Sequence, residues 1–149
     1  MPLTPPPRDG NGDVVPHDHP EIGDDDPVIR RISPEHVVPD PKAGTGRRIS
    51  TMAFQPSSHG NKGMSIDIEV LILEAQLDPK SFVTKPPFIG SVWFTARTLR
   101  NETLKVGYDP LEDNPYHGEV WGNFTVSRKK RLLEAARWYV EIDGVALHL

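Results

Sequence analysis

The first 26 residues differ in composition from the rest of this 149-residue chain. They hold six of its 16 prolines and seven of its 21 acidic residues, with almost no large apolar side chain among them. Such a segment buries too little surface to offset the entropy that ordering costs. We therefore expect residues 1–26 to form a disordered acidic tail, with polyproline II character near Pro5–Pro7, and residues 27–149 to form one domain.

The charge of the chain is divided in the same place. Of 17 basic residues only Arg8 lies in the tail, so residues 27–149 hold 16 basic and 14 acidic residues. A tail of this sign argues against a nucleic-acid-binding arm, which uses lysine and arginine to displace counterions from phosphate. The mildly basic domain points instead to an acidic protein or another anionic ligand as partner, and the oligomeric state stays open.

The chain has no cysteine, which excludes disulfides, zinc–thiolate sites and a thiolate nucleophile. Its first ten residues lack the basic start and apolar stretch of a signal peptide. The longest apolar run, Val70–Leu73, is far below the roughly 20 residues that cross a bilayer. We expect a soluble cytoplasmic protein with no membrane association.

Prolines and glycines divide residues 27–149 into short elements. Apolar and β-branched runs predict strands at 28–32, 47–54, 90–95, 104–108 and 119–121. A single helical turn is expected at 33–36, and helices are expected from Ser65 to near Asp78, at 96–100 and from Ser127 onward. The fold class that follows is α+β: a small domain with a short mixed or antiparallel sheet and two main helices, after a disordered tail.

Two arginine pairs on predicted strands are candidates for an anion-binding site: Arg30 with Arg31, and Arg47 with Arg48. If their strands are adjacent, the planar guanidinium groups can converge on a phosphate or carboxylate. Alternatively they form structural ion pairs with acidic residues of the domain or the tail.

The last predicted helix opens with four consecutive cations: Arg128, Lys129, Lys130 and Arg131. Cations are disfavoured at the N-terminal end of a helix, so an acidic partner would relieve the cost. These four are the candidate partner-binding residues, and the alternative is a solvated helix face.

An imidazole, a carboxylate, a phenol and an indole gather in the run from Asn114 to Gly122. His117 and Glu119 share one face of the predicted strand and are close enough for proton transfer or for orienting a ligand. The alternative is that Tyr116 and Trp121 pack in the core while His117 closes the turn.

Several sites are not indicated by the sequence. Residues 17–26 include metal-binding residue types, but they lack secondary structure and EF-hand spacing, so no metal site is assigned. The chain also lacks a nucleophile elbow, a P-loop, a Rossmann fingerprint and an H-E-x-x-H motif, which argues against the familiar hydrolase and nucleotide-binding classes.

Four segments, 28–32, 47–54, 63–67 and 114–120, together resemble a group of small uncharacterised bacterial proteins. A second similarity is to ADP-ribosyltransferases and RES-domain proteins, which place arginine on an early strand, serine on the next and glutamate on a late strand. That resemblance implies that Arg30 or Arg31 contacts the phosphates of NAD, that Ser50 braces the site and that Glu119 holds a ribose hydroxyl. Met52 stands where that pattern has a second serine, and a second carboxylate beside Glu119 is missing.

Two functional hypotheses follow. The first is a binding module that presents a basic face to an acidic or anionic partner, with the tail as a competing intramolecular ligand and no cofactor. The alternative is an NAD-consuming enzyme that uses Arg30 or Arg31, Ser50, His117 and Glu119. The two are distinguished by whether those side chains meet in one cleft.

Overall fold

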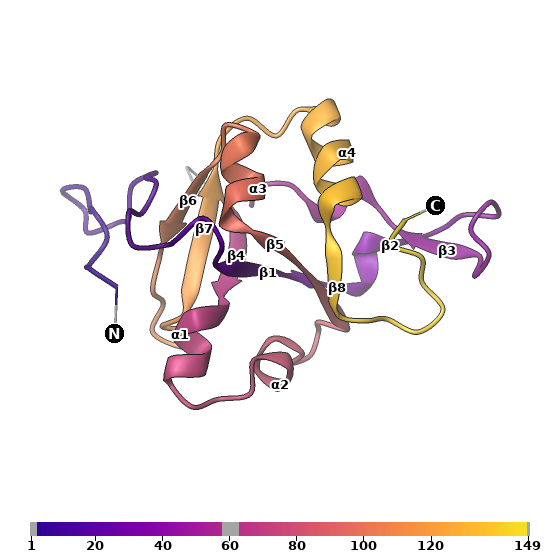
Figure 1. Ribbon diagram of the computed structural model, residues 1–149, viewed down its shortest axis with the longest axis horizontal. Helices are drawn as coiled ribbons and strands as arrows, with labels where there is room; N and C mark the ends of the chain where they lie inside the picture. The colour runs from indigo at the N-terminus through magenta and orange to yellow at the C-terminus, as the bar shows by residue number, and fades with distance from the viewer. Residues whose placement is uncertain (1–2, 58–62, 149) are drawn as a thin grey trace.

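The fold is described by a computed structural model for residues 3–57 and 63–148 (Figure 1). Its centre is a six-stranded sheet of order β6-β7-β4-β1-β5-β8, in which every neighbouring pair is antiparallel. The strands of this sheet are β1 (Pro27–Ile32), β4 (Met64–Ile68), β5 (Gly90–Thr95), β6 (Lys105–Tyr108), β7 (His117–Trp121) and β8 (Arg137–Val140). A separate ribbon pairs β2 (Val37–Pro39) with β3 (Arg47–Ile49).

Helices cover the sheet on two sides. On one side lie α1 (Glu69–Glu74) and α2 (Pro79–Val83), and on the other lie α3 (Ala96–Asn101) and α4 (Val126–Ala135) (Figure 1). Two single turns of 3-10 helix complete the chain, η1 (Pro34–His36) and η2 (Thr51–Ala53). The expected α+β class, with a short antiparallel sheet in a single small domain, is confirmed. Within the described residues, no helix has the length and apolar character needed to span a membrane.

The alternation of side chains along β1 builds the two sides of the core. Val28 and Ile32 face the larger apolar cluster, where the rings of Phe54 and Phe94 meet edge to face at 5.7 Å. Ile29 points the other way, into a smaller cluster beneath α1 and α2. β1 is therefore buried on both faces, as a central strand of a covered sheet should be.

The prediction of a helix that begins at Ser65 is wrong for the first turn of that helix. Residues Met64–Ile68 form β4, and α1 starts only at Glu69. Ile66 and Ile68 alternate into the core with at most 1% exposure, while Asp67 points to the opposite face. Ile68 fits both the strand period and the helix period, and pairing with β1 and β7 decides in favour of the strand.

Several further elements differ from expectation, among them the strand expected at 47–54, which is a strand only over Arg47–Ile49 and is followed by η2. Thr125, not Ser127, caps α4, since its hydroxyl accepts the N–H of Arg128 at 3.1 Å. The helix expected from Ser127 onward ends at Ala135, and the chain continues as β8, a strand that was not predicted. The short α2 was not predicted, although Asp78 caps it and Pro79 occupies its first position, the usual signals of a helix start.

The acidic N-terminal segment differs most from the expectation of a disordered tail. From His17 to Asp26 it packs against α3 and β6, and Ile22 is 1% exposed within the main core. Met1 and Pro2 lie outside the described residues. The burial of Ile22 and a fixed set of polar contacts offset the entropy cost of ordering the segment. Composition alone had indicated that this cost could not be offset.

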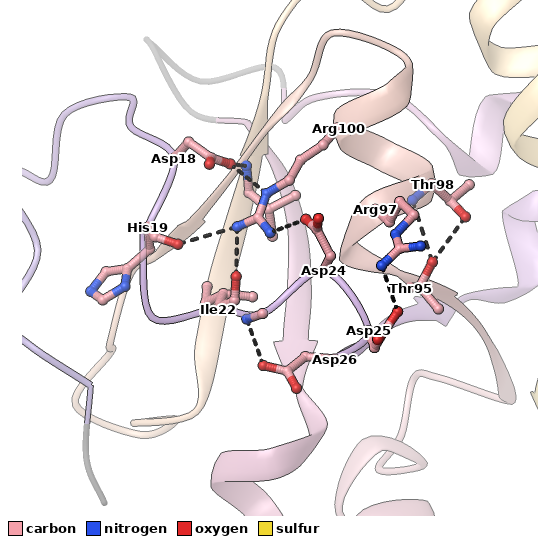
Figure 2. A network of polar contacts seen from close by, with 12 residues as sticks. Asp18, His19, Ile22, Asp24, Asp25, Asp26, Thr95, Arg97, Thr98 and Arg100 are labelled. Carbon is pink, nitrogen blue, oxygen red and sulfur yellow. Dashed lines mark hydrogen bonds and ion pairs between the residues drawn. The ribbon is translucent and has the colours of Figure 1, made fainter.

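Arg100 on α3 is the centre of those contacts (Figure 2). Its Nε donates to Asp18 at 2.9 Å and its Nη1 to Asp24 at 2.8 Å. Its Nη2 donates to the carbonyls of His19 and Ile22 at 3.1 and 2.7 Å. Arg97, on the same helix, also binds Asp25 at 3.0 Å, so Asp18, Asp24 and Asp25 all pair with arginines of α3.

Candidate functional site

A split in the central sheet creates the candidate site. β1 pairs with β5 as far as Ile32, but it pairs with β4 only at Val28 and Ile29. Beyond Ile29 the guanidinium of Arg30 makes hydrogen bonds in place of the backbone pairing between β1 and β4. Its Nη1 donates to the carbonyl of Ser65 at 3.0 Å, and its Nε donates to the carbonyl of Ala53 at 2.8 Å. A side chain thus bridges the strands where the ladder ends.

A cleft of about 450 Å³ opens at this split, within the range typical of small-molecule sites. Five parts of the chain form it: β1, β4, the segment from α2 to β5, the connection between β6 and β7, and the start of β7. The lining residues are Arg30, Arg31, Ser65, Ile66, Asp67, Phe82, Lys85, Phe88, Leu111, Asp113, Asn114 and His117.

One wall of the cleft is held by Arg31. Its guanidinium binds Asp67 in bidentate fashion, at 2.8 and 3.0 Å. It also lies 5.4 Å from the ring centroids of both Phe82 and Phe88. Asp67 accepts a further hydrogen bond from the side chain of Asn114 at 2.8 Å, which ties the β6–β7 connection to this wall. The charge of Arg31 is therefore matched, and its main effect is to fix the shape of the cleft.

Arg30 is the more deeply buried cation. Loss of solvent lowers its pKa to about 10, against the opposing effect of the Glu119 and Asp67 carboxylates. It remains protonated at neutral pH, with its contacts to protein oxygens as compensation. A buried cation beside a cleft is a frequent feature of ligand-binding and catalytic sites.

His117, which lines the cleft, lies between the carboxylates of Asp109 and Glu119. Its Nδ1 is 2.8 Å from the carbonyl oxygen of Asp109, which only accepts, so Nδ1 carries a proton. Its Nε2 is 3.8 Å from Oε1 of Glu119. Burial alone would lower the pKa of His117, but the hydrogen bonds to Asp109 and the charges of Glu119 and Asp109 outweigh it and leave that pKa above the ordinary value.

The same three residues raise the question of a metal ion. Asp109, His117 and Glu119 offer ligand atoms that all lie within 4.8 Å of one another. The lone pair of Nδ1 is not available while its proton is donated to Asp109, and the carboxylate of Asp109 lies on that side of the ring, 3.4 Å from Nδ1. The geometry suits holding and moving a proton at Nε2 better than binding a metal.

The structure brings together most, but not all, of the expected catalytic residues. Arg30, Arg31 and His117 line the cleft. Glu119 is 4% exposed and contacts the cleft residue His117. Ser50 does not line the cleft: it caps η2, and its N–H donates to the carbonyl of His36.

Ser65, and not Ser50, is a serine that lines the cleft. It lines the cleft and stands directly opposite Glu119 in the pairing of β4 with β7. Because residues 65–68 were expected to form a helix, the cross-strand position of Ser65 could not be foreseen. The correct signal was the alternation of Ile66 and Ile68 on either side of Asp67.

The two arginine pairs do not converge. Arg47 and Arg48 lie on the β2–β3 ribbon and do not line the cleft. Arg48 is paired with Asp40 at 2.9 Å, and Arg47 donates to the carbonyl of Asp143 at 3.3 Å. Of the four arginines expected to form an anion site, Arg30 and Arg31 line the cleft and Arg47 and Arg48 do not.

The four cations of α4 are also partly engaged. Glu102 binds Arg131 at 2.9 Å and lies 4.0 Å from Arg128. The ammonium of Lys129 is 3.4 Å from the side-chain oxygen of Gln55, and Lys130 is exposed. This cluster faces solvent at a site separate from the cleft.

Among the cleft residues that were not singled out from the sequence for this site are Asp67, Phe82, Lys85 and Phe88. The segment that carries the last three had no strong periodic pattern, so no signal placed it against β1.

Comparison with known proteins adds no family: no family model matches the chain, and neither the curated proteins nor the solved structures give a match.

Proposed function

We propose that the protein is an enzyme that binds a dinucleotide of the NAD type in the cleft and breaks the bond between nicotinamide and ribose. The observation that carries the proposal is the meeting of Arg30, Ser65, His117 and Glu119 at one split in the sheet. This is the order of arginine, serine and glutamate in the resemblance to ADP-ribosyltransferases and RES-domain proteins, with Ser65 in place of Ser50.

The chemistry needs charge of both signs. Breaking the glycosidic bond releases neutral nicotinamide with the bonding electron pair and leaves positive charge on the ribose carbon. The carboxylate of Glu119 is suited to hold a ribose hydroxyl and to offset that charge. The attacking hydroxyl or water then forms the new bond and loses its proton, for which Nε2 of His117 is placed when it is unprotonated.

The cations of the cleft are suited to the phosphates of such a ligand. Arg30 and Lys85 both line the cleft, and the ammonium of Lys85 lies 4.4 Å from the centroid of the Phe82 ring. Among the ion pairs recorded for the described residues, none involves Lys85. Phe82 and Phe88 add aromatic surface against which a planar base can pack.

Nicotinamide release from NAD tests the proposal. Purified protein is incubated with NAD and the products are separated by chromatography. We expect Glu119→Gln to lower the rate by about a hundredfold or more, Ser65→Ala to lower it less, and Ser127→Ala to leave it unchanged because Ser127 is an exposed residue of α4. The absence of release by the wild type, or full activity of a folded Glu119→Gln variant, would refute the proposal.

A second candidate is the binding module with a basic face for an acidic partner. The cation cluster Arg128–Arg131 favours it, because Glu102 offsets only part of its charge, Lys130 is exposed, and Arg128 lies in the first turn of α4, where cations are disfavoured. Removing residues 1–26 is an unsuitable test, since Ile22 belongs to the core. The aspartates of the acidic segment that form recorded ion pairs bind Arg97 and Arg100, which lie outside this cluster.

Charge reversal tests this candidate directly. A polyglutamate peptide should bind the wild type at low salt and bind the Lys129→Glu/Lys130→Glu variant at least about tenfold more weakly, with the difference lost at high salt. Lys42→Glu, in the loop between β2 and β3, is the matched control. Equal binding by both variants would remove the α4 cluster as the binding face.

A further inference from the structure

Asp109 and His117 lie at the two ends of the connection between β6 and β7 and are joined through both backbone and side chain. The N–H of Asp109 donates to the carbonyl of His117 at 3.0 Å, and Nδ1 of His117 is 2.8 Å from the carbonyl oxygen of Asp109. The carboxylate of Asp109 lies 3.4 Å from the same Nδ1. One residue therefore contacts both the backbone and the imidazole of His117.

The sequence favours a constant position for these contacts, because Pro110 follows Asp109. A residue before proline is restricted mainly to extended conformations, since in the α region its backbone and Cβ clash with the proline ring. The backbone of Asp109 thus has few conformations open to it. This restriction helps to keep its carbonyl oxygen beside Nδ1 of His117.

The contacts with Asp109 decide which nitrogen of His117 carries the proton. A carbonyl oxygen only accepts, so the neutral ring is protonated at Nδ1 and has its lone pair at Nε2. Nε2 lies 3.8 Å from Oε1 of Glu119, and His117 lines the cleft. The nitrogen that can accept a proton is therefore the one that faces Glu119.

The charge of the Asp109 carboxylate is available to the ring. The carboxylate is 21% exposed, and no arginine or lysine forms a recorded ion pair with it in the described part of the chain. Glu119 is the second carboxylate that acts on the ring. The other charged side chains that line the cleft are Arg30, Arg31, Asp67, Lys85 and Asp113. Of these, Asp67 is the cross-strand partner of His117, and its charge is matched by Arg31.

We infer that Asp109 is the positioning residue of His117 in the proposed reaction, and that it makes Nε2 the proton acceptor for the attacking water or hydroxyl group. The inference rests on the proposed function. The attacking oxygen bonds to the ribose carbon while the bond from that carbon to nicotinamide breaks, and the electron pair of the broken bond leaves with nicotinamide. The proton of the attacking oxygen passes to Nε2, and the charge of Asp109 stabilises the imidazolium that results.

NMR of the histidine rings tests the position of the proton without any substrate. The chain has six histidines, and the signals of His117 are identified by their loss in the His117→Gln variant. Above the pKa of His117, its nitrogen chemical shifts should show the proton on Nδ1. Asp109→Asn keeps the backbone contacts and removes the charge, so the pKa of His117 should fall by about one unit. Glu112→Gln, which alters an exposed carboxylate of the same connection outside the cleft lining, should leave that pKa unchanged.

The pH dependence of nicotinamide release tests the role of Asp109 in the reaction. Nε2 of His117 accepts a proton only when it is unprotonated, so kcat should rise with pH through the pKa of His117. Asp109→Asn should lower kcat about tenfold, leave KM unchanged and move the rise to lower pH by about one unit. An aspartate that only closes the turn would alter stability without moving that rise.

The inference would be overturned by a proton on Nε2 of the neutral ring, or by equal pKa values of His117 in the wild type and in Asp109→Asn. A rise of kcat that stays at the same pH in Asp109→Asn would overturn it as well. The protonated nitrogen is determined on the wild type, so this result stands even where the variant fails to fold. Wild-type protein that releases no nicotinamide would instead refute the proposed function, and the ring measurements would still show whether Asp109 orients His117.

Discussion

Replacing Arg100 by methionine removes the centre of the contacts that hold the N-terminal segment. Methionine keeps an apolar stem of similar length and deletes four hydrogen bonds, two to carboxylates and two to backbone carbonyls. The aspartates are 44% and 55% exposed, so each ion pair contributes only about 0.2–1 kcal/mol. The two bonds to the carbonyls of His19 and Ile22 contribute about 0.5–1.5 kcal/mol each.

The expected loss of unfolding free energy is therefore about 1.4–5 kcal/mol. Urea denaturation at neutral pH, followed by tryptophan fluorescence, measures it. If the segment detaches in the variant, the native state exposes more surface and the m-value falls as well. Arg97→Met is the matched control, because Arg97 lies on the same helix and binds an 88% exposed aspartate. It should cost less than about 0.5 kcal/mol. Equal losses in the two variants would refute the assignment of Arg100 as the residue that ties the segment to the domain.

Three further predictions concern the core and the cleft. Phe54→Ala should cost about 3–5 kcal/mol in thermal unfolding, because Phe54 is fully buried against Phe94. Asp67→Asn should cost about 3–5 kcal/mol by the same measurement, since it leaves Arg31 without its counter-charge in a largely buried place, and a loss below about 1 kcal/mol would contradict that role. His117→Asn should cost more stability at pH 6 than at pH 9. The folded pKa of His117 is raised, so the stabilisation is present below the ordinary pKa and is lost as pH rises through the folded value. A cost that grows with pH would contradict it.

Local sequence signals predicted the elements whose residues favour one structure. The run Gly90–Thr95 is apolar without a break and became β5, and Ser33 with Pro34 marked the turn η1. These signals failed at the boundary between β4 and α1, because Ile68 fits both the two-residue period of a strand and the 3.6-residue period of a helix. They failed also where single contacts outweigh composition, as at Ile22 in the acidic segment.

The candidate site shows the same division. His117 and Glu119 could be selected from their spacing on one strand, and Arg30 from its place on the first strand. Asp67 and Ser65 could not be assigned to the site, because their roles depend on strand pairing across distant parts of the chain.

The sequence by itself determined that this is a small, cysteine-free α+β chain with short elements, because prolines, glycines and side-chain periodicity act over a few neighbouring residues. Only the tertiary structure decided that β1 and β4 separate after Ile29, that a cleft opens there, and that the acidic segment lies along β6. These features arise from contacts between residues far apart in the chain, whose hydrogen bonds and burial carry no signature in local composition.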